Sequence, residues 1–338
     1  MFKKRNLIFL SLLILGVFLI SGCWLISTPT YTITYDGNGH TGGSVPTDST
    51  VYKENDTVTV LDKGDLVKTG YTFAGWNTAA DGSGTDQAEG STFIMGAADV
   101  TLFAKWATNT YTVIFNSQGG SAVSSKTVEH GGKVTKPTNP TKTGYTFGGW
   151  YKEFGCTNAW NFANDTVTAN VTLYAKWTPL YALRDTGPAG GLIFYVKEGG
   201  YSDGWMYLEA APSDQSDGAE WGCYGTYCGA DGTAVGTGEQ NTIDIEARCA
   251  TDDTAADICA NLSLGGYSDW FLPSRDELNL MYTNLHNIVP PVGGFADYYY
   301  WSSSEFDAAY AWLQNFYDGV QDLYYKNNTP RVRAVRAF

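Results

Sequence analysis

The stretch that decides the fold of the C-terminal part begins with YYYWSSSE at residues 298–305 and ends with RVRAVRAF at residues 331–338. Between these ends, Trp312, Gln314 and Phe316 lie two residues apart. This is the spacing of one face of a β-strand, because successive side chains of a strand point to opposite sides. The spacing predicts a strand that places Trp312 and Phe316 in a core.

A turn signal follows this strand. Asp318-Gly319 favours a tight hairpin turn, since both residue types tolerate a positive φ. Residues 320–325 are then predicted to return as the second strand. We expect Leu313, Asn315 and Tyr317 on the exposed face, opposite Trp312 and Phe316, so that this face is available for binding.

The stretch resembles the variable region of proteins that are diversified by retroelements. The residues that carry the resemblance are Trp301–Glu305, Ala311, Trp312, Gln314–Phe316, Gly319, Gln321, Lys326 and Arg331–Phe338. In that family, adenine-rich codons between the fixed residues are randomised during copying. The resemblance implies a variable region of about 300–338 with a ligand-binding surface formed by Phe306, Asp307, Ala308, Ala309, Tyr310, Leu313, Tyr317, Asp318, Val320, Asp322, Leu323, Tyr324 and Tyr325.

The residue types at these positions agree with such diversification. Each is reachable from an asparagine codon by changing only its first two bases, and none is Glu, Gln, Lys, Met or Trp, which are not reachable in this way. The fixed positions do include such types: Glu305, Trp312, Gln314, Gln321 and Lys326. A tyrosine-rich hairpin can also be only a half-buried sheet edge, because strands are enriched in aromatic residues. The partition of residue types favours the variable surface.

Tyrosine suits a binding surface because it offers a large contact area with few torsions to freeze. We therefore expect anchors at Tyr310, Tyr317, Tyr324 and Tyr325, with a negative rim from Asp307, Asp318 and Asp322 suited to a basic patch. Replacing Tyr317 or Tyr324 is predicted to cost little stability, whereas Trp312→Ala is predicted to unfold the domain.

Length and charge limit the alternatives. The 338 residues are enough for two or three domains. With 21 basic and 35 acidic residues the net charge is −14, which argues against nucleic acid as a partner. The 39 glycines and the many aromatic residues indicate short strands and tight turns. The predicted fold class is mainly β with some α.

The N-terminus has the pattern of an exported lipoprotein. Lys3–Arg5 is a positive segment, and Leu7–Ile20 is an apolar run too short to span a bilayer comfortably. Small residues then precede Cys23, as in a bacterial lipobox. The pattern predicts a signal peptide over residues 1–22 and a lipidated tether over 23–30, with Cys23 as the lipidation site. We expect a cell-surface protein that is anchored by lipid to a bacterial membrane, and we favour the outer membrane. The alternative is that the apolar run stays uncleaved and serves as a membrane anchor.

Two internal repeats follow, over residues 31–108 and 109–179. The segment KTGYTFAGW at 68–76 recurs as KTGYTFGGW at 142–150, and a second shared segment ends each repeat with Leu-x-Ala-Lys-Trp. Both copies resemble the internalin B-type (Listeria–Bacteroides) repeat, which implies a small β-grasp-like fold and a role as a stalk. The tryptophans of the pattern are predicted to form the core, with stacking on sugars as the alternative; they are Trp76, Trp106, Trp150 and Trp177.

A different composition begins near residue 183. The segments GGLIF at 190–194 and DWFLPS at 269–274, together with the C-terminal stretch, resemble the bacterial C-type lectin fold domain related to formylglycine-generating enzymes. The resemblance implies an α+β ligand-binding domain over residues 183–338. Ser274 followed three residues later by Glu277 is the capping-box spacing and predicts a helix that runs to about residue 286.

Export implies an oxidising compartment, in which cysteines pair. The candidates are Cys223, Cys228, Cys249 and Cys259, most simply as Cys223–Cys228 and Cys249–Cys259. Three pairings are open from the sequence. Cys156 is left over as a small buried hydrophobe. The spacing does not favour zinc, and no metal site or cofactor is predicted.

Three functions compete for this chain. The preferred one is a surface-displayed lipoprotein that binds a protein or glycan outside the cell through the diversified hairpin. The alternative is an adhesin of fixed specificity for host or cell-wall glycans or matrix proteins. An enzyme is disfavoured, because no cysteine follows Cys259 and the histidines, His40, His130 and His286, lie in separate regions. We therefore expect no catalytic residues.

Overall fold

The computed structural model describes residues 27–338, which divide into two compact units. The first unit runs to Tyr111 and includes Glu129–Gly132; the second comprises Thr112–Val128 and Lys133–Phe338. The predicted signal peptide and Cys23 lie outside the described residues. Within 27–338, no helix has the length and apolar character needed to cross a membrane.

The first repeat is built on a four-stranded sheet with the order β1-β6-β3-β4. Its first strand pairs in parallel with β6, and Trp76 of β3 is fully buried. The Trp76 indole donates to the Leu61 carbonyl at 3.0 Å, which satisfies its one polar group. The strands are β1 (Ile33–Asp36), β2 (Thr57–Thr59), β3 (Tyr71–Asn77), β4 (Asp86–Gln87), β5 (Thr92–Ile94) and β6 (Val100–Thr108).

The second repeat has a sheet with the order β8-β7-β10-β9 and the same aromatic core. Trp150 is 2% exposed and packs edge-on against Phe115 and Phe147. The prediction that Trp76 and Trp150 are core residues is thereby confirmed, and neither indole is free to stack on a sugar. The strands are β7 (Thr110–Asn116), β8 (Lys126–Glu129), β9 (Tyr145–Tyr151) and β10 (Val171–Pro179).

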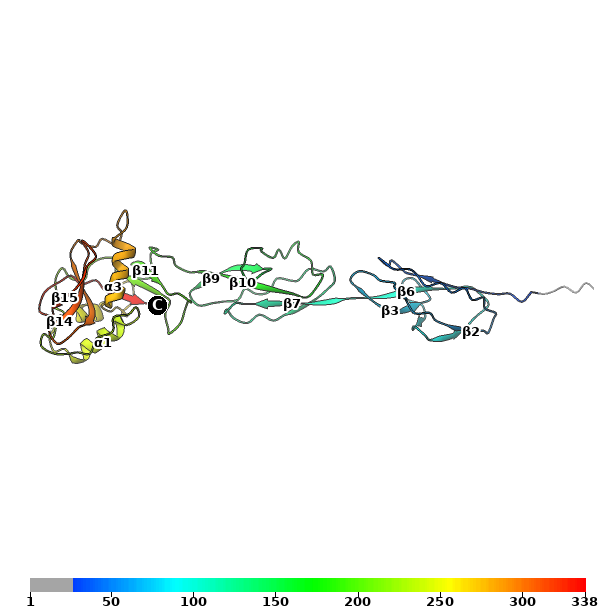
Figure 1. The fold of residues 1–338 in the computed structure, drawn as a ribbon, viewed down its shortest axis with the longest axis horizontal. Helices are drawn as coiled ribbons and strands as arrows, with labels where there is room; N and C mark the ends of the chain where they lie inside the picture. The colour runs from blue at the N-terminus through cyan, green and yellow to red at the C-terminus, as the bar shows by residue number, and fades with distance from the viewer. Residues whose placement is uncertain (1–26) are drawn as a thin grey trace, which may run out of the picture. The chain divides into compact units, whose positions relative to one another are not determined.

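The C-terminal domain places helices between and beside two small sheets (Figure 1). One sheet has the order β11-β12-β16 and the other the order β13-β14-β15. The elements are β11 (Leu192–Val196), β12 (Tyr207–Ala210), α1 (Gly238–Arg248), α2 (Ala255–Ala260), α3 (Arg275–Met281), η1 (Tyr282–His286), β13 (Tyr299–Glu305), β14 (Tyr310–Asn315), β15 (Gln321–Tyr325) and β16 (Val335–Ala337). Strands predominate over helices, which confirms the predicted fold class.

Helix α3 starts where the sequence predicts. The Ser274 hydroxyl accepts from the Glu277 backbone N–H, and the Glu277 carboxylate accepts from the Ser274 N–H at 2.7 Å. This reciprocal capping box satisfies two N–H groups at the start of the helix. One turn of π-helix then carries the chain to His286, as expected. Leu278 and Met281 of α3 pack in one core with Phe194 of β11 and Tyr300 of β13.

Candidate functional site

The C-terminal hairpin forms as predicted, with β14 as the central strand of its sheet. Tyr310 pairs with Tyr325 at one end of the β14–β15 ladder, and Gln314 pairs with Gln321 at the other. Gly319 closes the turn with a φ of 82°, and a Cβ at this position would lie 2.5 Å from the Tyr282 ring. Only glycine therefore fits at Gly319 without displacing the ring.

The expected assignment of faces is wrong at Leu313. This side chain is 2% exposed and lies in a core cluster with Ala311 and Trp301, whereas Trp312 on the other face is only partly buried. The physical reason is that β14 is covered on both sides. Helix α3 approaches the Trp312 face, with the Arg275 guanidinium 5.1 Å from the indole centroid. Neither face of β14 is therefore fully exposed to solvent.

The other predicted surface residues reach solvent from the turns and from the edge strand β15. Tyr317 is 76% exposed, and Asp318 and Asp322 are also exposed. The partly exposed members are Asp307, Ala308, Ala309, Tyr310 and Leu323. The large exposed side chains besides Tyr317 are Phe306, Val320, Tyr324 and Tyr325. Apart from Leu313, each member of the predicted set is therefore at least partly accessible to a ligand.

Tyrosines gather in pairs on this surface. The rings of Tyr310 and Tyr325 stack with centroids 4.5 Å apart, and Tyr324 stacks on Tyr299 at 6.2 Å. A hydrogen bond with the Tyr325 side chain raises the pKa of Tyr310 to about 12, so the Tyr310 phenol is neutral near pH 7. Stacked tyrosines present flat rings with hydroxyl groups at their edges, which can bind apolar, polar and cationic groups.

A buried ion pair fixes the base of the hairpin. The side chains of Glu305, at the end of β13, and Lys326, just after β15, are fully buried and contact each other directly. Glu305 also accepts backbone N–H groups of Cys228 and Gly229 at 2.7–2.9 Å. Lys326 donates to the Thr226 carbonyl at 3.0 Å. Such additional hydrogen bonds are required if a buried pair is to offset the loss of hydration.

The serines of the WSSSE motif are buried rather than displayed. Ser302 donates to the Trp312 carbonyl at 2.8 Å, and Ser304 donates to the Gly232 carbonyl at 2.7 Å. The Trp301 indole donates to the Ala219 carbonyl at 2.9 Å. These residues join β13 to β14 and to the preceding loops, so they position the hairpin and do not face a ligand.

The cysteines pair differently from the simplest expectation. Cys223 bonds to Cys249, whereas Cys228 and Cys259 are free and buried. The predicted Cys223–Cys228 and Cys249–Cys259 bridges are therefore wrong, although a Cys223–Cys249 bridge belongs to one of the open pairings. Cys156 is free and only partly buried, which differs from the expected buried position. Pairing depends on which distant segments meet in the fold, and spacing along the chain does not reveal this.

Sequence reasoning missed two exposed tyrosines beside the hairpin. Tyr224 and Tyr227 are 54% and 50% exposed in the loop after Cys223, and the Tyr224 ring lies 6.1 Å from that of Tyr325. The available signal was a pair of aromatic residues flanking Gly225 within a short segment bounded by cysteines. Their place beside the hairpin follows only from the tertiary fold.

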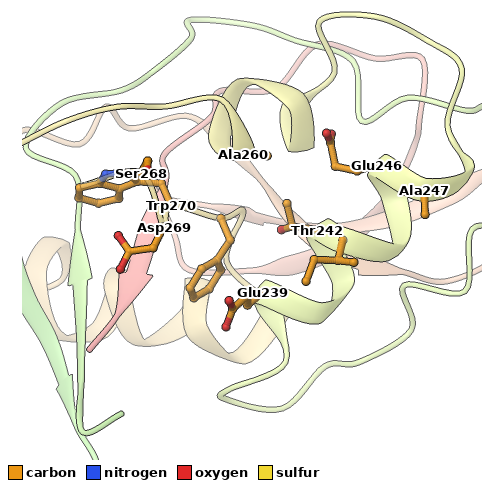
Figure 2. Close-up of a pocket in the computed structure, with 10 residues that line it drawn as sticks. Glu239, Thr242, Glu246, Ala247, Ala260, Ser268, Asp269 and Trp270 are labelled. Carbon is orange, nitrogen blue, oxygen red and sulfur yellow. The ribbon is translucent and has the colours of Figure 1, made fainter. Parts of the chain in front are cut away.

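A separate hollow of about 470 Å³ lies beside α1 (Figure 2). Glu239 and Glu246 extend from α1 on one side, and Asp269 and Trp270 lie on the other. Burial and a hydrogen bond with Asp257 raise the pKa of Glu246 to about 7. Asp269 is already paired with Arg336 at 2.8 Å. Over residues 27–338, no group of three or more His, Cys, Asp or Glu side chains is arranged to hold a metal.

Comparison with known families identifies the parts of the chain. Residues 31–105 and 111–176 match the Listeria-Bacteroides repeat domain, and residues 212–336 match the Lcl C-terminal domain. Two Listeria-Bacteroides repeats and an Lcl C-terminal domain are therefore present. The predicted repeats are confirmed by this match.

Relatives share only part of their length with this chain. A putative Gly-rich membrane protein of Evansella cellulosilytica is 46% identical over 147 residues, covering 44% of this chain and 17% of that protein. Internalin H of Listeria monocytogenes is 40% identical over 112 residues, covering 33% of this chain and 20% of that protein. The chain thus spans about a fifth of the length of these relatives.

Two solved structures match this chain with low TM-scores. A fimbrial protein from Bacteroides ovatus matches with a TM-score of 0.33 and 11% identity, covering 91% of this chain and 99% of that one. Domains 3–4 of a streptococcal cell surface protein with high-identity tandem repeats match with a TM-score of 0.21 and 18% identity, covering 44% and 98%. Neither score describes a shared overall architecture.

Proposed function

We propose that this protein is a lipid-anchored bacterial surface protein whose C-terminal domain binds an extracellular ligand through the exposed side chains of the β13–β15 hairpin. The positions between the fixed residues are diversified, and the repeats act as a stalk. The lipid is attached at Cys23. Binding a protein or glycan outside the cell is the activity of the surface, and catalysis is not part of the proposal.

One observation carries the proposal: the fixed and the variable positions differ in burial. Fixed residues such as Trp301, Glu305 and Lys326 are fully buried and bonded to the backbone or to each other. Nearly all positions of the predicted variable set are exposed or partly exposed, with Leu313 as the exception. The domain therefore keeps its backbone when the exposed side chains change, because surface substitutions usually alter the free energy of unfolding by less than about 0.5 kcal/mol.

Surface location is supported by the repeats and by the names of the relatives. The chain carries Listeria-Bacteroides repeats and is similar to Internalin H, and other relatives are named as membrane proteins. A single acyl chain binds a membrane only weakly, so stable anchoring at Cys23 requires more than one chain. Replacing Cys23→Ala should release the protein from the membrane fraction, and retention of the variant on membranes would contradict the lipid anchor.

Deep sequencing of the last part of the gene across a population of carriers tests the diversification. We expect substitutions at codons 306–310, 317–318, 320 and 322–325, and uniform codons at 301–305 and 331–338. If all of these codons are uniform, the hairpin has a single specificity and the protein is an adhesin of fixed specificity. In that case the proposal that this surface is diversified is wrong.

A further inference from the structure

The loop of residues 222–231 is attached to the hairpin by backbone contacts. The Gly225 N–H donates to the Ala308 carbonyl at 2.8 Å, and the N–H of Trp221, the residue before the loop, donates to the Lys326 carbonyl at 2.9 Å. Both acceptors are main-chain atoms, so these bonds do not depend on which side chain occupies position 308. The loop therefore stays in place when the variable positions change.

Fixed side chains hold the rest of this loop. Glu305 accepts from the N–H groups of Cys228 and Gly229, and Lys326 donates to the Thr226 carbonyl. The Cys223–Cys249 bridge joins the loop to the end of α1. Because these hydrogen bonds and the disulfide hold the loop at several points, it loses little conformational freedom when a ligand binds. A small loss of conformational freedom favours affinity.

The side chains that the loop displays continue the aromatic surface of the hairpin. Tyr224 lies beside Tyr325, whose ring stacks on Tyr310, and Tyr227 is exposed on the same loop. We name Tyr224 and Tyr227 the constant arm, because neither lies among the predicted variable positions. Tyr224, Tyr325 and Tyr310 are neighbouring rings of one aromatic patch, and Tyr227 adds a further exposed ring three residues after Tyr224. Exposed aromatic patches mark interaction sites.

The charges at this patch are mainly negative. The Tyr227 hydroxyl donates to the Asp231 carboxylate at 3.1 Å, and the Asp307 carboxylate lies at the start of the turn that leads to Tyr310. The positive charge of Lys326 is fully buried against Glu305 and is not offered to a ligand. One exposed cation, Arg248, lies beside Gly229, two residues after Tyr227, so the carboxylates of Asp231 and Asp307 outnumber the cations near the loop. Tyrosine faces next to carboxylates favour a cationic group, through cation–π attraction and ion pairing.

We propose that the constant arm, Tyr224 and Tyr227, is a permanent part of the ligand-binding surface and that it binds lysine or arginine side chains of a protein partner. The inference rests on the proposed function, since it assigns the arm to the same surface. The arm supplies the contacts common to all variants of the protein, and the variable positions decide which basic segment is preferred.

Panning a phage-displayed library of random peptides on the full chain tests this assignment. We expect the selected peptides to contain more lysine and arginine than the unselected library. A selected synthetic peptide should bind Y224A/Y227A about tenfold or more weakly than the unchanged protein, the loss typical of anchor residues. Tyr325→Ala should also weaken binding. Tyr201→Ala, an equally exposed tyrosine outside the patch, is the matched control and should bind normally.

The outcomes separate the two proposals. If Tyr325→Ala weakens binding while Y224A/Y227A does not, the assignment of the constant arm to the binding surface is wrong, and the proposed role of the hairpin is retained. If both Y224A/Y227A and Tyr325→Ala bind the peptide as tightly as the unchanged protein, the hairpin surface fails as well. If no peptide is selected, or the selected peptides are not enriched in basic residues, the preference for a cationic protein segment is overturned. Thermal melting of each variant, expected to match the unchanged protein, verifies that the domain is folded.

Discussion

Glu305 and Lys326 form a fully buried ion pair at the base of the C-terminal hairpin, 21 residues apart in the chain. Each is also bonded to the backbone of the loop at residues 226–229. The pair therefore joins three segments: the end of β13, the residue after β15 and the tyrosine-bearing loop. Its removal should affect all three at once.

Loss of either partner of this pair should strongly destabilise the domain. Lys326→Met leaves the buried Glu305 without its partner charge, and Glu305→Gln leaves the buried Lys326 without its partner charge. An unpaired buried charge lowers the free energy of unfolding by roughly 3–5 kcal/mol. Urea unfolding measures the change. The combined variant should lose less than the sum of the two single variants. The Lys197–Asp203 pair, in which the Asp203 side chain is exposed, is the control, and Asp203→Asn should cost less than about 1 kcal/mol. Equal small losses at both pairs would contradict the structural role of Glu305 and Lys326.

The burial of Leu313 changes which substitution should be most damaging. Leu313→Ala removes a fully packed side chain and should cost about 2–5 kcal/mol in the free energy of unfolding. Tyr317→Ala, at 76% exposure, should change it by less than about 0.5 kcal/mol. Trp312→Ala, expected from the sequence to unfold the domain, should leave it folded because the indole is only partly buried. Chemical denaturation measures the free energy of unfolding of the three variants. A smaller loss of this free energy for Leu313→Ala than for Tyr317→Ala would refute the assignment of faces.

The capping residue of α3 should make stability depend on pH. Complete burial raises the pKa of Glu277 to about 7, above its ordinary value of 4.5. The folded state then holds the proton more tightly than the unfolded state, so the contribution of Glu277 to the free energy of unfolding is largest below about pH 4.5 and is lost as the pH rises through 7. Glu246 also has its pKa raised to about 7, so the measurement is made in a Glu246→Gln background. Adding Glu277→Gln should flatten the decline between pH 5 and pH 8 in urea unfolding; an unchanged slope would show that Glu277 is not its source.

The disulfide should appear as one specific linkage in the mature protein. Peptide mapping without reduction should recover the Cys223–Cys249 peptide and find Cys228 and Cys259 as thiols. Replacing Cys223 and Cys249 together with serine should lower the free energy of unfolding by about 2–4 kcal/mol, because the bridge closes a loop of 26 residues in the unfolded chain. Replacing the free Cys156 with serine is the control. A Cys223–Cys228 peptide would contradict the observed pairing.

Features that depend on nearby residues were predictable from the sequence. The Ser274–Glu277 capping box, the Gly319 turn and the burial of Trp76 and Trp150 are all set by short-range spacing, and the structure agrees with each. The other two tryptophans of the repeats, Trp106 and Trp177, are only partly buried, so their predicted place in the core is not fully met. The faces of β14 were not predictable in this way. Whether Leu313 or Trp312 is buried depends on what packs over each side of the sheet, and α3 lies more than thirty residues earlier in the chain. The Cys223–Cys249 bridge, the position of Tyr224 and the contacts of Glu305 are long-range in the same sense.

Burial of Leu313 has a consequence for how the gene should vary. If its codon is randomised along with its neighbours, mutation supplies polar and apolar residues there equally, but folding accepts few of the polar ones. Surviving lineages should then carry Leu, Ile, Val or Phe at codon 313 and a broad range of residues at codon 317. Variation at codon 313 would thus be limited by purifying selection, although the codon lies in a hypermutable segment. Variation at codon 317 would instead reflect the mutations as they arise.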